Sequence, residues 1–127
     1  MKGSARLVLS DCFPELVRWW RDVFWDLGEI RVVDEFSFEL GVRKPTKLRW
    51  HLGHFTRADL QGSGREFIVD TEHFILHIQS QEPLVVVPVR GSNTEAHPEA
   101  FRWHTVLEIE PVTNSAQHKI ITRWVLK

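Results

Sequence analysis

Hydrophobic and polar side chains alternate with a period of two residues along much of the chain. In the segment 47–52, leucine or tryptophan occupies every second position, and basic residues lie between them. The segments 73–79 and 101–110 repeat this pattern. Because successive side chains of a β-strand point to opposite faces, the alternation predicts strands with one buried face and one polar face.

Shorter runs of β-branched and aromatic residues add further strands to this prediction, at 6–9, 67–70, 84–89 and 119–126. Turn-forming Gly, Pro, Asn and Ser separate them, at 44–45, 61–64, 91–93 and 114–115. Pro88 cannot donate a ladder hydrogen bond, so we expect its strand at a sheet edge or a bulge. About eight or nine short strands predict an all-β fold, an antiparallel two-layer β-sandwich, in one domain over residues 1–127.

Residues 11–36 allow a helix as well as strands. Asp11, followed by Pro14, would cap a helix that runs to about Phe24. Packed on a curved antiparallel sheet, this helix would make the fold α+β. Periodicity alone does not decide between helix and strand over the short apolar segment 14–25.

The second interpretation of the same residues is a β-hairpin. The segments 15–25 and 30–36 would pair, and the turn between them would hold Gly28 at a positive φ. Trp, Phe and Val cluster here, and these residues favour strands. The hairpin is therefore the interpretation that we adopt.

Composition restricts the chemistry. The 127 residues include six Trp and eight Phe but no Tyr, so no phenol is available as a proton donor. The balance of 16 basic and 17 acidic side chains argues against a nucleic-acid partner. A single cysteine, Cys12, excludes an intrachain disulfide and a thiolate zinc cluster.

No targeting or membrane-spanning pattern is recognisable in this sequence. No stretch approaches the ~20 apolar residues of a membrane span. The residues after Met1 lack the apolar region of a signal peptide. We expect no membrane partner, while localisation and oligomeric state, including a homo-oligomer, stay open.

The dipeptide Arg-Trp occurs four times, at 18–19, 49–50, 102–103 and 123–124. Neighbouring side chains on a strand point to opposite faces. We therefore expect each of these Trp side chains to point inward and each Arg side chain to point outward.

Seven histidines raise the question of a metal site. His51 and His54 are three residues apart, so on one strand they would point to opposite faces. His73 and His77 share a face, but their Cα atoms would lie ~13 Å apart, too far for one ion. A zinc site would need side chains from different strands, and the residues alone predict no metal and no other cofactor.

The alternation also predicts which basic side chains point outward: Arg49, His51, His73, His77, Arg102 and His104. If their strands are neighbours, these residues form a cationic face that would bind an anionic ligand, including an acidic polysaccharide. The alternative is an ordinary solvated sheet face. No nucleophile motif and no glycine-rich phosphate loop is present, so we assign no catalytic residue.

Five segments then point to a family. Residues 18–23 turn at Gly28 into Ile-Arg-Val-Val-Asp-Glu-Phe, and Leu-Arg-Trp-His-Leu-Gly, Phe-Ile-Leu-His-Ile and Ile-Ile-Thr-Arg-Trp-Val follow along the chain. This order resembles the C-terminal β-sandwich region of heparinase II/III-like polysaccharide lyases, over residues 15–126. The resemblance implies β-elimination on uronate-containing polysaccharides by Tyr and His residues that come largely from an α/α-toroid. A toroid is not encoded in these 127 residues, so we do not expect the chain to be an enzyme on its own.

The resemblance also implies a possible zinc site. Some family members hold zinc through a His on the first strand, the Asp that ends the second strand and a later His. Asp34 matches the Asp, and His51 or His73 would be the later His. The first-strand position falls among residues that do not bind zinc: Val17, Arg18, Trp19 and Trp20.

The sequence therefore predicts a non-catalytic β-sandwich accessory module. Its partner would be a catalytic domain or an acidic polysaccharide, contacted through the Arg/His face. The alternative is a stand-alone small globular protein that binds a hydrophobic ligand or a partner protein. That protein would use an N-terminal helix rich in Trp, with Trp19, Trp20 and Trp25, and a curved sheet. A third hypothesis, metal-assisted hydrolysis by the histidines, requires bound zinc.

Overall fold

The structure is a computed structural model that describes residues 2–10, 16–39, 47–53, 58–91, 104–113 and 115–127. These residues form ten β-strands and no α-helix. The strands are β1 (Gly3–Val8), β2 (Leu16–Asp26), β3 (Glu29–Phe38), β4 (Leu48–Gly53), β5 (Asp59–Ser63), β6 (Glu66–Asp70), β7 (Phe74–Ser80), β8 (Leu84–Gly91), β9 (His104–Pro111) and β10 (Gln117–Leu126).

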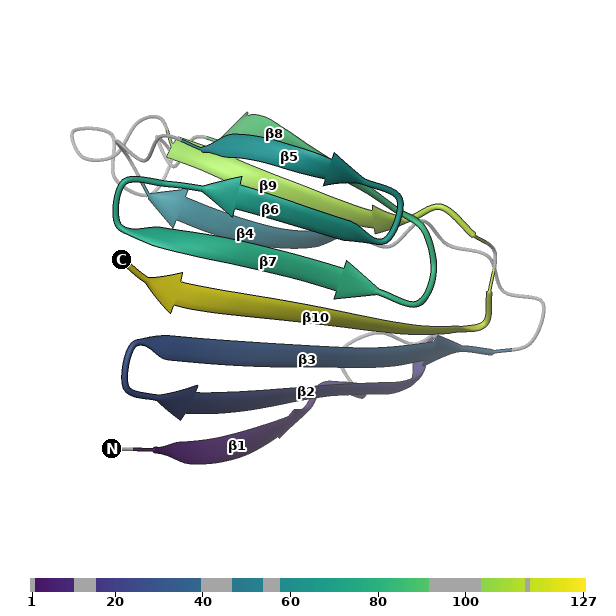
Figure 1. The fold of residues 1–127 in the computed structure, drawn as a ribbon. Coiled ribbons are helices and arrows are strands. Elements are labelled where there is room, and N and C mark those ends of the chain that lie inside the picture. Colours follow the sequence, from purple (N-terminus) through teal and green to yellow (C-terminus); the bar gives the residue numbers. More distant parts are fainter. Residues whose placement is uncertain (1, 11–15, 40–46, 54–57, 92–103, 114) are drawn as a thin grey trace.

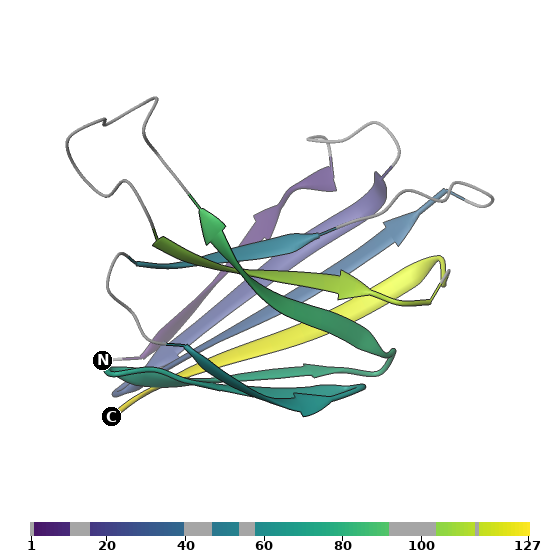
Figure 2. The ribbon, with the colours of Figure 1, turned by 90° about the horizontal axis from the view of Figure 1, so that it is seen from above.

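The ten strands form two antiparallel sheets (Figure 1). One has seven strands in the order β1-β2-β3-β10-β7-β6-β5, and the other has three in the order β4-β9-β8. Figure 2 shows the three-stranded sheet lying across one face of the larger sheet. We call the faces that the sheets turn toward each other the inner faces, and the opposite ones the outer faces. The arrangement confirms the all-β sandwich, with ten strands in place of eight or nine.

The N-terminal Trp-rich segment is a strand. β2 and β3 pair as a hairpin with Asp26 opposite Glu29, and Gly28 in the turn has a φ of 76°. The hairpin is thus confirmed, and the helix is wrong for residues 16–24, while residues 11–15 lie outside the described part. Alternation along β2 sends Trp19 to the core and Trp20 to the outer face.

Two features of the strand ends bear on the prediction. β8 is an edge strand of the three-stranded sheet, which confirms the position expected for Pro88. The sequence does not predict β5, because Gly62 and Ser63 have the composition of a turn. They lie in the strand, and the turn follows at Gly64 and Arg65.

The core fills the space between the sheets. Its residues with no exposed surface come from both sheets: Val69, Leu76, Ile78, Leu107, Ile109 and Ile120. Trp50 and Trp124 meet edge to face across the core, with ring centroids 5.4 Å apart, while Arg49 and Arg123 point outward. The Arg-Trp prediction holds at these two pairs and at 18–19, where Trp19 packs against the core and Arg18 lies near Glu35 on the outer face. Residues 102–103 lie outside the described part. In the described ranges, no helix has the length and apolar character needed to cross a membrane.

Candidate functional site

Arg49 and His51 lie on the outer face of the three-stranded sheet, on β4. Arg49 lies opposite Glu108 on β9, and its Nε donates a hydrogen bond to that carboxylate at 2.8 Å. The Lys47 ammonium lies 3.7 Å from the same carboxylate. The hydrogen bond from Arg49, together with the charge of Lys47, holds the pKa of Glu108 below its usual value. Arg49 is therefore already paired with a carboxylate.

The other residues of the predicted Arg/His face lie elsewhere. His77 is on the outer face of the seven-stranded sheet, on β7. His73 lies in the turn before β7, with a side chain that is 78% exposed. Arg102 lies outside the described residues, and only the backbone of His104 is described.

The structure thus divides the predicted face between opposite sides of the sandwich. The period of two assigned Arg49 and His77 to outer faces correctly. However, β4 and β7 belong to different sheets, because alternation along a strand says nothing about which strands become neighbours.

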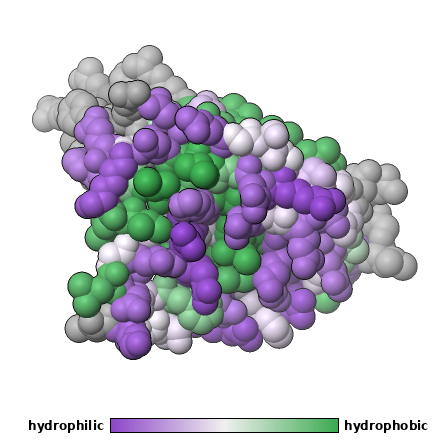
Figure 3. All heavy atoms as spheres, in the orientation of Figure 1, coloured by the Kyte–Doolittle hydropathy of each residue, from purple (hydrophilic) through white to green (hydrophobic). Residues whose placement is uncertain are grey.

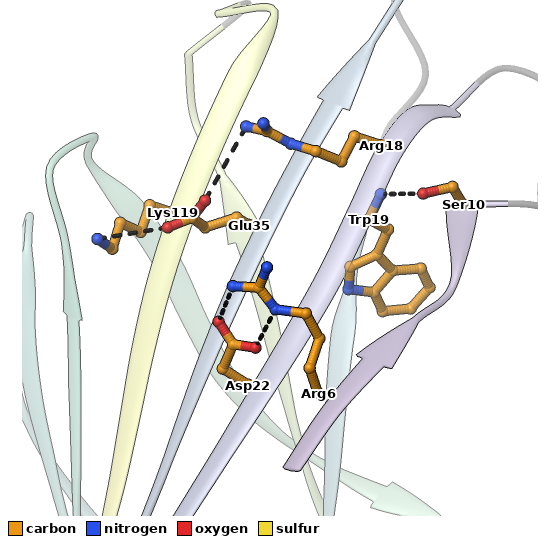
Figure 4. Close-up of polar contacts among 7 residues, drawn as sticks. All are labelled: Arg6, Ser10, Arg18, Trp19, Asp22, Glu35 and Lys119. Atoms are coloured by element: carbon orange, nitrogen blue, oxygen red, sulfur yellow. Dashed lines mark hydrogen bonds and ion pairs between the residues drawn. The ribbon is translucent and has the colours of Figure 1, made fainter. Parts of the chain in front are cut away.

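Ion pairs connect neighbouring strands on the outer face of the seven-stranded sheet (Figure 4). Arg6 on β1 binds Asp22 on β2 through two hydrogen bonds of 2.6 and 2.8 Å, which lower the pKa of Asp22. Glu35 on β3 lies 3.9 Å from Arg18 and 3.4 Å from Lys119. Each of these cations therefore has a carboxylate as its neighbour.

The three N-terminal Trp residues have separate environments. The Trp20 ring lies under two guanidiniums, with the Cζ atoms of Arg6 and Arg18 at 4.4 and 4.5 Å from its centroid. Trp19 packs against the core, and Trp25 is 37% exposed at the hairpin end. They do not form one hydrophobic binding face.

A row of basic side chains crosses the outer face of the seven-stranded sheet. The strand registers place His77 opposite Arg123, and Arg123 opposite Arg31 on β3. The Cζ atom of Arg31 lies 4.6 Å from the ring centroid of Phe24, and no carboxylate of the described residues forms an ion pair with Arg31. The Nε atom of Arg123 lies 3.7 Å from a Glu29 oxygen. We call His77, Arg123 and Arg31 the basic row.

Two hollows adjoin the ends of the basic row. A hollow of about 480 Å³ has Arg31 in its wall, together with the aromatic rings of Phe24 and Trp25. A second hollow, of about 330 Å³, is lined by His77 and by Ile68. The row is thus continuous with concave surface on both sides.

Sequence reasoning missed Arg31 and Arg123 as members of a site. Two signals were present in the sequence. The Arg-Trp pattern predicts that Arg123 points outward, and the alternation along 30–36 predicts on which face of its strand Arg31 lies. Their proximity depends on the pairing of β3 with β10, which are some 90 residues apart in the sequence. That pairing is not visible in the sequence.

A buried ion pair lies on the inner face. Asp34 on β3 has no exposed surface and accepts hydrogen bonds of 2.7 and 3.1 Å from Arg21 and one of 3.1 Å from the Trp19 indole. The Arg21 guanidinium also lies 5.0 Å from the ring centroid of Trp50. Arg21 therefore connects Asp34 of the seven-stranded sheet with Trp50 of the three-stranded sheet.

The residues considered for zinc do not fit a metal site. Asp34 is on the inner face of β3, with its carboxylate engaged by Arg21. His51 is on the outer face of β4, and His73 is in the turn before β7. Across the part of the chain that the structure describes, no three His, Cys, Asp or Glu side chains cluster closely enough to hold a metal ion.

Comparison with known proteins gives matches among solved structures alone. No family model and no curated protein matches the chain. A heparinase III structure matches with a TM-score of 0.73 and 13% identity, over 98% of this chain and 19% of that chain. A mutant of the heparan sulfate lyase HepC from Pedobacter heparinus matches with a TM-score of 0.62 and 13% identity, over 90% of this chain and 18% of that chain. A heparinase III with methylated lysines matches with a TM-score of 0.63 and 18% identity, over 96% of this chain and 19% of that chain.

The chain therefore spans about a fifth of the length of the structures that it matches. Its fold is that of a β-sandwich segment of heparinase III, as the order of its sequence segments predicted.

Proposed function

We propose that the chain is a non-catalytic β-sandwich module that works beside the catalytic unit of a polysaccharide lyase and contacts acidic polysaccharide. The observation that carries this proposal is the extent of the match, which takes in nearly all of this chain but a fifth of a heparinase III chain. The composition agrees with it, because the chain has no Tyr to serve as a proton donor for β-elimination.

Exposed apolar side chains support a protein partner. On the inner face of β1–β3, Leu7, Ile30 and Trp25 are 47%, 47% and 37% exposed and lie outside the core cluster. Trp25 and Ile30 lie opposite each other near the end of the β2–β3 hairpin, and Leu7 lies farther along β1, opposite Arg21. Exposed apolar side chains that share a sheet face are typical of an interaction surface. We assign this surface to the catalytic unit, because the matched lyases continue well beyond the segment that resembles this chain.

Basic side chains on the outer faces support the polysaccharide contact. Arg49 and His51 are exposed on one side of the sandwich, and the basic row lies on the other. Guanidinium groups bind carboxylates and sulfate-like anions through charge-assisted hydrogen bonds. Either side would therefore contact an acidic glycan.

Two measurements on the purified chain test the proposal. Incubation with heparan sulfate should release no unsaturated uronate, which is detected by its ultraviolet absorbance. Calorimetric titration with the same glycan should show saturable binding. Cleavage by the chain alone would contradict the non-catalytic role. If neither heparan sulfate nor polygalacturonate binds in such titrations, the proposed polysaccharide contact is contradicted.

Photo-crosslinking in the producing cell tests the protein partner. A photoreactive amino acid in place of Ile30 should become crosslinked to a polypeptide that contains a polysaccharide lyase domain, identified by mass spectrometry. The matched control carries the same amino acid in place of Val85, an equally exposed residue of β8 in the other sheet. Capture at Ile30 of copies of this chain alone, or equal capture at both positions, would contradict the assignment.

A further inference from the structure

The basic row departs from the charge pattern of its surroundings. Several basic side chains lie directly opposite a carboxylate on the next strand: Arg6 opposite Asp22, Arg21 opposite Asp34, Arg49 opposite Glu108 and Lys119 opposite Glu35. Arg31 instead lies opposite Arg123. Like charges directly opposite each other destabilise a sheet. This placement costs stability unless an anion joins the two guanidiniums.

From this arrangement we infer that the basic row is a binding site for a sulfate or carboxylate group carried on a sugar ring. An acidic oligosaccharide would then lie along the outer face of the seven-stranded sheet. The inference rests on the proposed contact with acidic polysaccharide, and it assigns that contact to His77, Arg123 and Arg31.

The spacing of the row suits a ligand with more than one hydrogen-bond acceptor. Adjacent strands lie about 4.8 Å apart, so the three positions from β7 to β3 span about 10 Å. Each guanidinium offers five N–H donors in a plane, and the imidazole of His77 adds another donor. Donors from neighbouring strands therefore reach the oxygens of one anionic group or of two successive groups.

The carboxylates nearby leave the row available. The contact between Arg123 and Glu29 is 3.7 Å long, and both side chains are more than 40% exposed. Exposed ion pairs of this kind contribute little to stability, so an incoming anion would displace Glu29. Asp26, in the wall of the larger hollow, already accepts a hydrogen bond from the backbone N–H of Leu27 at 2.7 Å.

The surroundings of the row suit a sugar better than a bare ion. Phe24 is 37% exposed beside Arg31, in the wall of the larger hollow. Figure 3 shows this face of the molecule, on which hydrophobic patches lie among polar side chains. A sugar ring presents apolar C–H faces and polar edges, so it matches an aromatic ring flanked by hydrogen-bond donors.

Paired charge-removing variants test the site. Arg31→Gln/Arg123→Gln and the control Arg6→Gln/Lys119→Gln each remove two positive charges from the same outer face. The control residues lie opposite carboxylates, Asp22 and Glu35, whereas Arg31 and Arg123 lie opposite each other. Calorimetric titrations use heparin oligosaccharides, sulfate-free oligogalacturonate, carboxylate-free dextran sulfate and neutral dextran. Urea denaturation of each variant confirms that it folds.

The parent chain should bind at least one acidic glycan and not neutral dextran. Arg31→Gln/Arg123→Gln should weaken that binding by about tenfold or more, the effect of losing one charge-assisted contact or several. The control should change it by less than about threefold. Phe24→Ala should weaken binding of the oligosaccharide and leave binding of inorganic sulfate unchanged.

Three results would overturn the assignment. Equal weakening by both double variants would mean diffuse attraction by the whole face. If Arg49→Gln loses binding while Arg31→Gln/Arg123→Gln keeps it, the contact belongs to the other sheet. In both of these cases the proposed polysaccharide contact stands. A parent chain that binds no acidic glycan would overturn the basic row and the proposed contact together.

Discussion

Arg21 and Asp34 form an ion pair inside the sandwich, joined by two hydrogen bonds of 2.7 and 3.1 Å. Asp34 has no exposed surface, and a third hydrogen bond comes from the indole of Trp19. Burying a carboxylate is costly, so a buried carboxylate persists where donors replace its water shell. The stability of the β2–β3 hairpin therefore depends on these two residues, which face each other across its strands.

Replacing Arg21 with Leu should destabilise the protein strongly. The substitution leaves the Asp34 carboxylate buried with the Trp19 indole as its remaining donor among those described, and breaking a buried pair costs about 3–5 kcal/mol. The free energy of unfolding in urea measures the loss. The double variant Arg21→Leu/Asp34→Leu should recover most of it, because no buried charge is left. Equal losses in the single and double variants would show that packing, and not the charge, is responsible.

Acidification should destabilise the protein through His118. Burial against Phe36 lowers the pKa of His118 below its ordinary value of 6.5, although Glu82 and the Ser115 backbone oppose this. The unfolded chain therefore binds the proton first as the pH falls through 6.5. The free energy of unfolding decreases from there until the pH reaches the folded-state pKa.

Urea denaturation over a series of pH values checks this effect. His118→Phe, which keeps an aromatic ring beside Phe36 and Phe38, should lose this part of the pH dependence. The control His73→Gln changes an exposed histidine and should keep it. Identical pH profiles for the parent and His118→Phe would refute the assignment.

Gly62→Ala should disrupt the β5–β6 hairpin. Gly62 has a φ of 111°, and a Cβ atom there would overlap the backbone carbonyl oxygen of Glu66. The clash involves backbone on both sides, so the strands must separate. Gly28→Ala is the matched control, because its φ is 76° and a Cβ atom meets nothing within 4 Å. We expect a loss of about 1–2 kcal/mol for Gly28→Ala and a larger one for Gly62→Ala. Thermal denaturation compares them, and equal losses would rule out the clash.

Removing one charge of the basic row should not destabilise the fold. Arg123→Gln removes one of two like charges that the strand register places opposite each other, so the free energy of unfolding should stay equal or rise by about 0.5 kcal/mol or less. Arg6→Gln, which breaks a bidentate pair with Asp22, should lower it instead. High salt should reduce the difference between these variants. A clear loss of stability in Arg123→Gln would mean that Arg123 serves the fold and not a ligand.

The strands were largely predictable, because alternation is a local property of the sequence. The hairpin of β2 and β3 was predicted from its Gly-centred turn and its aromatic and β-branched residues. β5 was not, because Gly62 and Ser63 have the composition of a turn. The glycine is required there by its close approach to Glu66, which belongs to the pairing of two strands and not to either one.

The candidate site was predictable side chain by side chain, but not as a site. Alternation sent Arg49, His77 and Arg123 outward, and all three point outward in the structure. It did not show that Arg49 belongs to another sheet, or that Arg123 meets Arg31 across β3 and β10.

By itself, the sequence determined the all-β class, the hairpin and the face of most side chains, because these follow from dihedral preferences and a period of two. The tertiary structure alone decided which strands pair and in which register. Pairing between distant segments depends on how both sheets bury their apolar faces in one core. That choice placed Arg31, Arg123 and His77 in one row, and it buried Asp34 and brought Arg21 against Trp50 of the other sheet.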